Sequence, residues 1–136
     1  MTRFIILVLT LFLTTSEAYA EWAKTAESDD ATGYGDPDTI RSKGNLVKMW
    51  ILNDYKTIQT VAGDSYLSQK MQWEYDCAEE QSRLIAGYSY SGQMGTGKIM
   101  FSKTNPGNWA PAMPGSMGHA NWVFACKKLG TNGPIF

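Results

Sequence analysis

The sequence has few of the side chains that most metal sites and many enzyme sites require. Its 136 residues include one His and two Cys, so a zinc site of the usual Cys/His kind would need carboxylates to complete it. A catalytic triad built on imidazole has only that one His to use. The 12 basic and 13 acidic side chains leave a net charge of −1, which provides no basic surface for nucleic acid or an anionic membrane. The composition therefore favours a non-catalytic domain without a nucleic-acid partner.

Aromatic side chains, in contrast, are plentiful. Five Trp, seven Tyr and five Phe are many for a chain of this length. Such rings fill cores and also anchor partners at binding surfaces. The length fits one small domain.

The one long apolar run lies at the N-terminus and predicts a secretory signal peptide, Met1–Ala20. Arg3 precedes the run Phe4–Leu13, which is shorter than the roughly 20 residues of a membrane-spanning helix. Ala18–Ala20 matches a cleavage site, so Glu21 becomes the new N-terminus. The alternative is an uncleaved anchor. We expect an exported single domain, residues 21–136, in the periplasm, at the cell surface or secreted.

If the protein is exported, its two cysteines are expected to be oxidised. In an oxidising compartment, Cys77 and Cys126 are expected to form a disulfide, because two cysteines allow only one intramolecular pairing. Two free thiols with a redox role are the alternative, but no C-x-x-C motif is present.

Alternating apolar and polar side chains predict several strands. The run Leu46–Tyr55 is apolar on both faces, which indicates a central strand, and a turn at 62–64 follows it. In Tyr66–Cys77, every second residue is apolar from Met71 onward, which indicates one buried face. The other predicted strands are Trp22–Glu27, Thr39–Lys43, Leu84–Tyr90 and Lys98–Lys103, with turns at 28–30 and 34–38. Short connections without helices favour an antiparallel sheet.

The C-terminal stretch has a helical pattern. Ser116 is the predicted N-cap and Gly130 the predicted C-cap. Between them, one stripe has a spacing of three or four residues and comprises His119, Trp122, Val123, Cys126 and Leu129. A bond from Cys126 to Cys77 would tie this helix to the sheet. The predicted fold is α+β, an antiparallel sheet with one C-terminal helix packed on a face and tethered by the disulfide.

Three motifs suggest chemistry, and each has a simpler interpretation that we favour. Gly92–Lys98 fits G-x-x-x-x-G-K, but Ile99 replaces the Ser or Thr of a phosphate loop and a strand follows, so we interpret it as a glycine-rich hairpin. His119 is a candidate metal or haem ligand, although a packed structural His is favoured. The paired carboxylates at 29/30, 36/38 and 79/80 are interpreted as solvated loop charge, and no G-x-S-x-G elbow exists.

A set of aromatic residues is the candidate binding surface. Four of them are expected to share one sheet face, and the fifth precedes a proline-rich turn. The set is Trp73, Tyr75, Tyr88, Tyr90 and Trp109. If the helix covers only part of that face, the remainder forms a concave aromatic surface that could hold a partner. The alternative, that all five are core, stays open and is favoured for so small a domain.

The order of several short motifs resembles the surface-adhesin protein E family of Gram-negative bacteria. The resemblance extends from about Trp22 to Leu129. Its marks, in chain order, are Tyr34-x-Asp36-x-x-Thr39-Ile40, Val47–Tyr55, Ser68-x-Lys70, Tyr75-Asp76-Cys77, Arg83, Tyr88, Trp109, Pro114-Gly115-Ser116 and Cys126.

The resemblance implies a six-stranded antiparallel sheet with a C-terminal helix on its concave face. It also implies an adhesin that binds host matrix and serum proteins, binds haem and forms dimers. No binding residue carries over, because the shared marks belong to the scaffold. We expect a non-catalytic binding module for a host or envelope protein, with no cofactor or metal of its own. The alternatives are a periplasmic inhibitor or accessory factor of an envelope enzyme, acting through Asn105–Gly115, and an enzyme with an unrecognised site.

Overall fold

The computed structural model describes residues 21–127. The predicted signal peptide, its cleavage residue Ala20 and the predicted C-cap Gly130 lie outside this range. The described elements are β1 (Ala23–Glu27), β2 (Ala31–Gly35), η1 (Pro37–Thr39), β3 (Arg41–Lys43), β4 (Leu46–Val61), β5 (Asp64–Asp76), β6 (Gln81–Tyr90), η2 (Gln93–Gly95), β7 (Ile99–Lys103), β8 (Ala110–Pro111) and α1 (Met117–Lys127). No helix among these residues is both long and apolar enough to cross a membrane.

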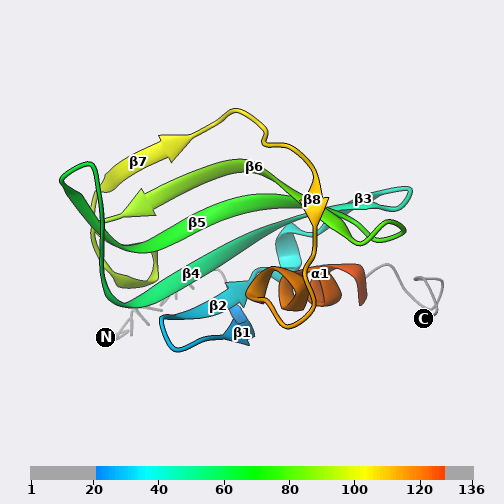
Figure 1. The fold of residues 1–136 in the computed structure, drawn as a ribbon, viewed down its shortest axis with the longest axis horizontal. Coiled ribbons are helices and arrows are strands. Elements are labelled where there is room, and N and C mark those ends of the chain that lie inside the picture. The colour runs from blue at the N-terminus through cyan, green and yellow to red at the C-terminus, as the bar shows by residue number, and fades with distance from the viewer. Residues whose placement is uncertain (1–20, 128–136) are drawn as a thin grey trace, which may run out of the picture.

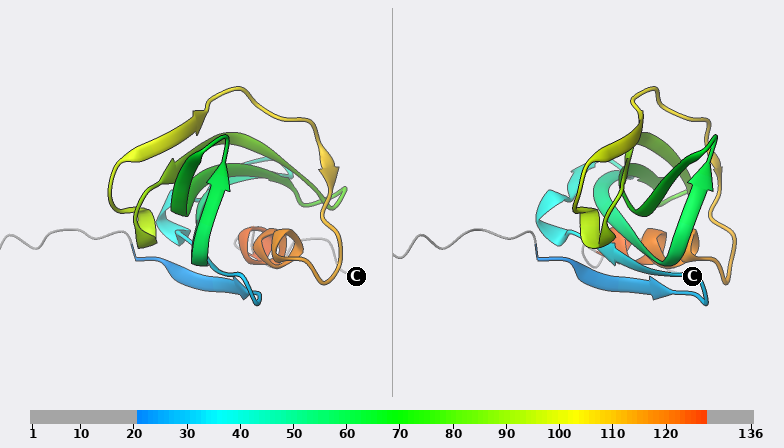
Figure 2. Two further views of the ribbon diagram at one scale, coloured as in Figure 1. Left: turned by 60° about the vertical axis from the view of Figure 1, so that its left-hand side comes forward. Right: turned by 90° about the vertical axis from the view of Figure 1, so that its left-hand side faces the viewer.

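The strands form one antiparallel sheet, as predicted. Six of them are hydrogen-bonded in the order β1-β2-β4-β5-β6-β7, and the short strands β3 and β8 pair with β4 and β6 respectively. The sheet curves around the single helix, α1, which lies inside the curve (Figures 1 and 2). We call the face that carries Val47, Met49 and Tyr75 the concave face, and the opposite face, which carries Trp50 and Lys70, the convex face.

The central hairpin is longer than predicted. β4 continues to Val61 and β5 begins at Asp64, so a two-residue turn joins them. Both turn residues have positive φ, 51° at Ala62 and 87° at Gly63. Two such residues form the tight hairpin turn that matches the right-handed twist of the strands. The extension was not predicted, because the residues near the tip of the hairpin are mostly polar and show no apolar alternation.

Strand β2 was not predicted, and it includes the first two residues of the turn expected at 34–38, whose later residues do form the short turn η1. Both glycines of β2 lie where the backbone is closely packed. A Cβ at Gly33 would come within 2.8 Å of Cε of Met117, and one at Gly35 within 3.2 Å of the Met49 side chain. The glycines therefore let β2 approach the helix and the core.

A β-bulge in β6 changes which side chains share a face. Trp73 pairs with Leu84, but the neighbouring Gln72 pairs with Ala86, so Ile85 has no partner across the ladder. Since side chains alternate along a strand, the extra residue moves the following side chains to the opposite face. Leu84 lies on the concave face and Tyr88 on the convex face, whereas the alternation had predicted them together.

Helix α1 begins at the predicted N-cap. Oγ of Ser116 accepts a hydrogen bond from the backbone N–H of His119 at 3.1 Å, and its hydroxyl donates to the Met113 carbonyl at 2.6 Å. The residues that the helix buries are Asn121, Trp122, Ala125 and Cys126. The predicted stripe thus contains Trp122 and Cys126. It omits Asn121, which is polar, and Ala125, which is small.

The predicted disulfide between Cys77 and Cys126 is present and joins the end of β5 to the helix. Both cysteines belong to the core, together with Val47, Met49, Ile51, Tyr75, Ala112, Trp122 and Ala125. The indole N–H of Trp122 donates to the Asp76 carbonyl at 2.9 Å, one residue before the disulfide. A covalent bond and a hydrogen bond therefore hold the helix at the same end of the sheet.

Because of Tyr75, the stability of this core is expected to fall at alkaline pH. The side chain is 1 % exposed, and burial raises the pKa of its phenol far above the value of about 10 in an unfolded chain. Above pH 10 the unfolded chain releases this proton and the folded chain keeps it, so stability falls as pH rises. We expect a loss of about 1.4 kcal/mol per pH unit from this group, measured by denaturant titration from pH 9 to 11.

The matched variant is Tyr75→Phe, which keeps the ring and lacks the titrating group. We expect its stability to change less with pH over that range. An equally steep alkaline loss in the wild type and the variant would contradict this assignment.

Candidate functional site

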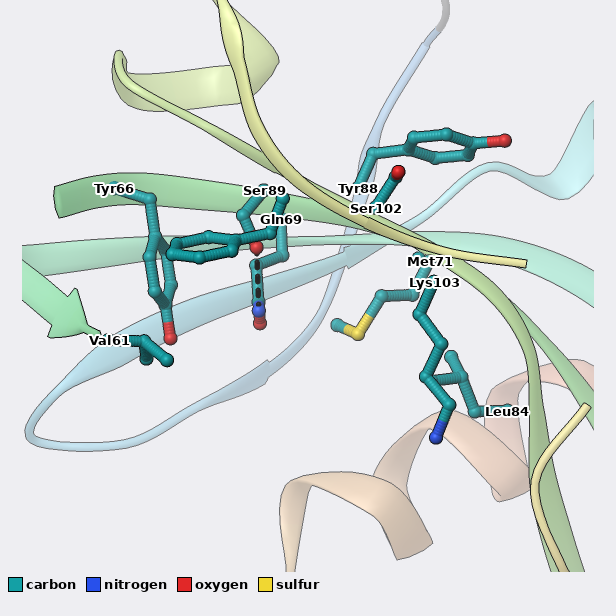
Figure 3. A pocket seen from close by; sticks show the side chains of 11 residues that line it. Val61, Tyr66, Gln69, Met71, Leu84, Tyr88, Ser89, Ser102 and Lys103 are labelled. Carbon is teal, nitrogen blue, oxygen red and sulfur yellow. Dashed lines mark hydrogen bonds between the residues drawn. The ribbon is translucent and has the colours of Figure 1, made fainter. Parts of the chain in front are cut away.

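The helix covers one end of the concave face and leaves the other end open. The open end is a groove of ≈ 300 Å³ between the β4–β5 hairpin, β6 and β7 (Figure 3). We call it the concave groove. Its lining residues are Val61, Tyr66, Gln69, Met71, Leu84, Gly87, Tyr88, Ser89, Phe101, Ser102 and Lys103.

The floor and one wall of the concave groove are apolar. Met71 and Leu84 lie along it, and Gly87 leaves room between them, because a Cβ there would meet Cγ of Met71 at 3.3 Å. The wall consists of Tyr66 and Phe101, whose rings meet edge to face with centroids 6.1 Å apart. Edge-to-face rings hold each other in a fixed orientation, so this wall is preformed.

Two polar side chains of the groove, Gln69 and Ser89, are already hydrogen-bonded. The Tyr55 hydroxyl donates to Oε1 of Gln69 at 2.7 Å, and Nε2 of Gln69 donates to Oγ of Ser89 at 3.1 Å. Burial raises the pKa of the Tyr55 phenol, and the neighbouring Tyr66 phenol adds to the effect. The hydroxyl therefore stays protonated and keeps its donor role. With these groups paired, the groove presents mainly hydrocarbon to a ligand.

A second depression, of ≈ 360 Å³, shares Leu84 with the concave groove and continues it towards the start of the helix. Trp73 forms part of it, and the segment 107–113 forms another part. The indole N–H of Trp73 is buried and has no acceptor among the described residues. A buried donor without a partner is costly to the fold.

The five predicted aromatic residues do not form one surface. Trp73 and Tyr75 lie on the concave face, and Tyr75 belongs to the core. Tyr88 and Tyr90 lie on the convex face, because the bulge at Ile85 reverses β6. In Figure 3 the Tyr88 ring points away from the groove. The expectation of a single face for these four rings is therefore wrong, although the open concave remainder that it envisaged does exist.

Trp109, the fifth residue, packs on Arg83. The guanidinium lies 4.8 Å from the centre of the indole ring. Arg83 also donates to Oε1 of Glu74, from Nε at 2.8 Å and from Nη2 at 2.7 Å, and Glu74 is 6 % exposed. Trp109 is therefore part of a half-buried ion-pair cluster on the convex side, which holds the loop after β7.

Sequence reasoning missed the residues that line the concave groove. Tyr66 and Gln69 lie on β5 and Phe101 lies on β7, and they are brought together only by the pairing of both strands with β6. Their shared signal is weak, because Tyr66 and Gln69 lie three residues apart on one strand and simple alternation would place them on opposite faces. Phe101, in the middle of a short predicted strand that follows a glycine-rich turn, is the residue that this signal could have indicated.

The other candidate motifs have structural explanations. In Gly92–Lys98, the short turn η2 leads into strand β7 and not into a helix, so the phosphate-loop geometry is not formed, as expected. Asp29, Asp30 and Glu79 are exposed as predicted, whereas Asp36 is only 7 % exposed, so its interpretation as solvated loop charge is wrong.

His119 does not form a haem site with its neighbours. Its ring stacks on Trp122 at 5.7 Å, with 22° between the ring planes. The depression beside it is lined mostly by small and polar residues, with Met117 as its one large apolar side chain, whereas a porphyrin needs two broad apolar walls. Among residues 21–127, no group of three or more His, Cys, Asp or Glu side chains could hold a metal ion. We derive no function through haem.

Comparison with family models gives one decisive match. The model described as surface-adhesin protein E matches residues 22–127, which is most of the chain. The chain belongs to the surface-adhesin protein E family. No curated protein matches.

Solved structures of the surface-adhesin protein E family share the fold. One structure of Haemophilus influenzae protein E matches with a TM-score of 0.65 and 12% identity, and the match covers 87% of this chain and 92% of that one. A second crystal form gives 0.59 and 13%, over 76% and 92%. Protein E from non-typeable Haemophilus influenzae gives 0.54 and 11%, over 81% and 78%. At such low identity these matches show a shared fold and do not identify binding residues in this chain.

Proposed function

We propose that this protein is an exported, non-catalytic binding module that holds an apolar segment of a host or envelope protein in the concave groove. The observation that carries the proposal is the open, preformed and mainly hydrocarbon end of the concave face. Apolar grooves whose own polar groups are already paired gain affinity by excluding water. The adhesin family supports a protein as the partner.

Export belongs to the same proposal. The predicted signal peptide, residues 1–20, directs the chain out of the cytoplasm, and the disulfide requires an oxidising compartment. We place the mature protein in the periplasm or at the cell surface. Fractionation of cells into periplasm, outer membrane and medium tests this placement, and a cytoplasmic chain with an uncleaved leader would contradict it.

The binding test uses two exposed apolar residues of the same hairpin. Val61 lines the groove and is 50% exposed, while Ile58 is 64% exposed and lies outside it. Both tolerate a charge without loss of the fold, because neither is buried. We expect Val61→Asp to weaken binding about tenfold or more, and Ile58→Asp to leave it nearly unchanged.

The measurement is surface plasmon resonance against purified host matrix and serum proteins and envelope proteins. We expect at least one partner with a Kd below about 100 µM. If no partner binds, or if both variants bind a partner as the wild type does, the concave groove is not the binding site.

A periplasmic inhibitor or accessory factor is the second candidate function. Its supporting observation is Met113, which is 63% exposed in the segment that follows β8. An exposed, flexible apolar side chain on a loop suits insertion into an enzyme cleft. Inhibition assays against lysozyme-type enzymes and proteases distinguish this candidate, because flat dose curves would exclude it.

Dimer formation is a further part of the proposal. It rests on the family resemblance alone. Sedimentation velocity over a range of protein concentrations measures it, and a monomer at every concentration would exclude it.

A further inference from the structure

The convex face, which points away from the helix, has a cavity of its own, of ≈ 300 Å³. It is lined by side chains from the residue before β1, from the turn η1 and its N-cap, and from the central strands β4, β5 and β6. The lining residues are Trp22, Asp36, Thr39, Trp50, Lys70, Tyr88 and Tyr90. We call it the convex cavity. Four aromatic rings are unusual on the outer face of a sheet, which is ordinarily polar.

One end of the convex cavity is acidic. Asp36 is 7 % exposed, and its Oδ1 accepts only the backbone N–H of Asp38, at 3.1 Å. No Lys, Arg or His nitrogen of residues 21–127 lies within ion-pair distance of this carboxylate. Buried carboxylates are seldom left without a cation, because the desolvated charge is costly. Within the described part of the chain, this end therefore lacks a positively charged side-chain partner.

The other end is basic. Nζ of Lys70 lies 5.3 Å from the centre of the Tyr90 ring and has no carboxylate partner among the described residues. Its chain is held in place by the turn η2, since a Cβ at Gly95 would come within 2.3 Å of Cε of Lys70. The ammonium is thus positioned at the cavity, where it can bind an anion.

Stacked rings line the cavity together with these two charged groups. Trp50 and Tyr88 have centroids 6.3 Å apart and planes inclined by 22°. Aromatic faces attract organic cations, and the attraction grows when the site is shielded from water. A ligand that lies across these rings can meet the carboxylate and the ammonium together.

We propose that the convex cavity binds a small zwitterion that carries an organic ammonium group and an anionic group. The ammonium lies against the rings beside Asp36, and the anionic group meets Lys70. A simple cation would be repelled by Lys70 and a simple anion by Asp36, so the two charges of the cavity select a molecule with both. Phosphocholine and glycine betaine have this chemistry, and the cavity volume is at the small end of the range for ligand sites.

The test is titration of the mature, oxidised protein with phosphocholine and with glycine betaine. Binding is followed by tryptophan fluorescence and by the indole N–H signals of Trp22 and Trp50 in NMR spectra. We expect at least one zwitterion to bind, with a Kd on the order of 1 mM or tighter. Choline alone and inorganic phosphate alone are expected to bind about tenfold more weakly or worse.

Two variants test the roles of the charged groups. Asp36→Asn keeps the acceptor for the Asp38 N–H and removes the charge, and Lys70→Gln removes the ammonium. Each is expected to weaken zwitterion binding about tenfold. Asp29→Asn, an exposed carboxylate outside the cavity, is the matched control and is expected to bind as the wild type does.

The NMR signals keep the test decisive even if a variant unfolds, because they report on the wild-type cavity directly. Failure of both zwitterions to shift the Trp22 and Trp50 signals at concentrations up to about 20 mM would overturn the proposal. Equal affinity in Asp36→Asn, Lys70→Gln and the wild type would also overturn it. Cosedimentation with phosphatidylcholine vesicles distinguishes a lipid headgroup, which pellets the protein, from a free solute, which does not.

Discussion

Replacing both cysteines, Cys77→Ala with Cys126→Ala, is expected to lower the free energy of unfolding by about 4 kcal/mol. The disulfide spans 49 residues of sequence, and its loss gives the unfolded chain the conformational entropy of that loop. Domains of this size are stable by only about 5–15 kcal/mol, so the loss is a large share. Guanidinium chloride denaturation, followed by circular dichroism, measures it.

The location of the disulfide indicates which part of the structure its removal affects first. Helix α1 has 11 residues, and isolated helices shorter than about 12–15 residues are marginal in water. We therefore expect the double variant to lose helical signal before the sheet unfolds. Wild-type protein reduced with dithiothreitol is the control and is expected to behave in the same way. An unchanged denaturation midpoint in both would show that the disulfide contributes nothing to the stability.

Trp122→Ala is expected to lower the free energy of unfolding by about 3–5 kcal/mol. The indole is 4% exposed and packs in the core between the helix and the sheet. Its removal leaves a cavity in the core and also removes the hydrogen bond to the Asp76 carbonyl. Urea denaturation of the variant measures the change.

Trp122→Phe separates the two contributions. It keeps most of the apolar volume and removes only the N–H donor, so we expect a loss of about 1–2 kcal/mol. Combined with the cysteine variants, Trp122→Ala is expected to be less than additive, because both changes release the same helix. Equal losses for the Ala and Phe variants would mean that the hydrogen bond outweighs the packing.

Local pattern predicted the parts of the fold that depend on neighbouring residues. Alternation indicated β4, β5, β6 and β7, and Ser116 indicated where the helix begins, because each of these signals acts within a few residues. The disulfide was predicted from the expected oxidising compartment and from the presence of two cysteines alone. Tyr75 was correctly placed on the face that receives the helix, since it shares the alternation of Cys77.

Other features depend on contacts that no local pattern records. Leu84, Ile85 and Ala86 are all apolar, so nothing in the sequence shows which of them is the bulged residue. This one residue decides whether Tyr88 faces the helix or solvent. Gly35 was assigned to a turn because its partner in close packing, Met49, lies on another strand. Both candidate binding regions are assembled from several strands, and so only strand register could define them.

The packing of α1 against β1 sets the order in which the chain can complete its fold. β1 is the first element described and α1 is the last, yet the helix packs on β1, and the Thr25 hydroxyl hydrogen bonds to Asn121. Because a chain is made from its N-terminus, β1 must wait for nearly all of the described residues before it meets its helix. Cys77 waits likewise, and no third thiol exists to capture it in the meantime. A chain without a competing cysteine can therefore close late and still close correctly.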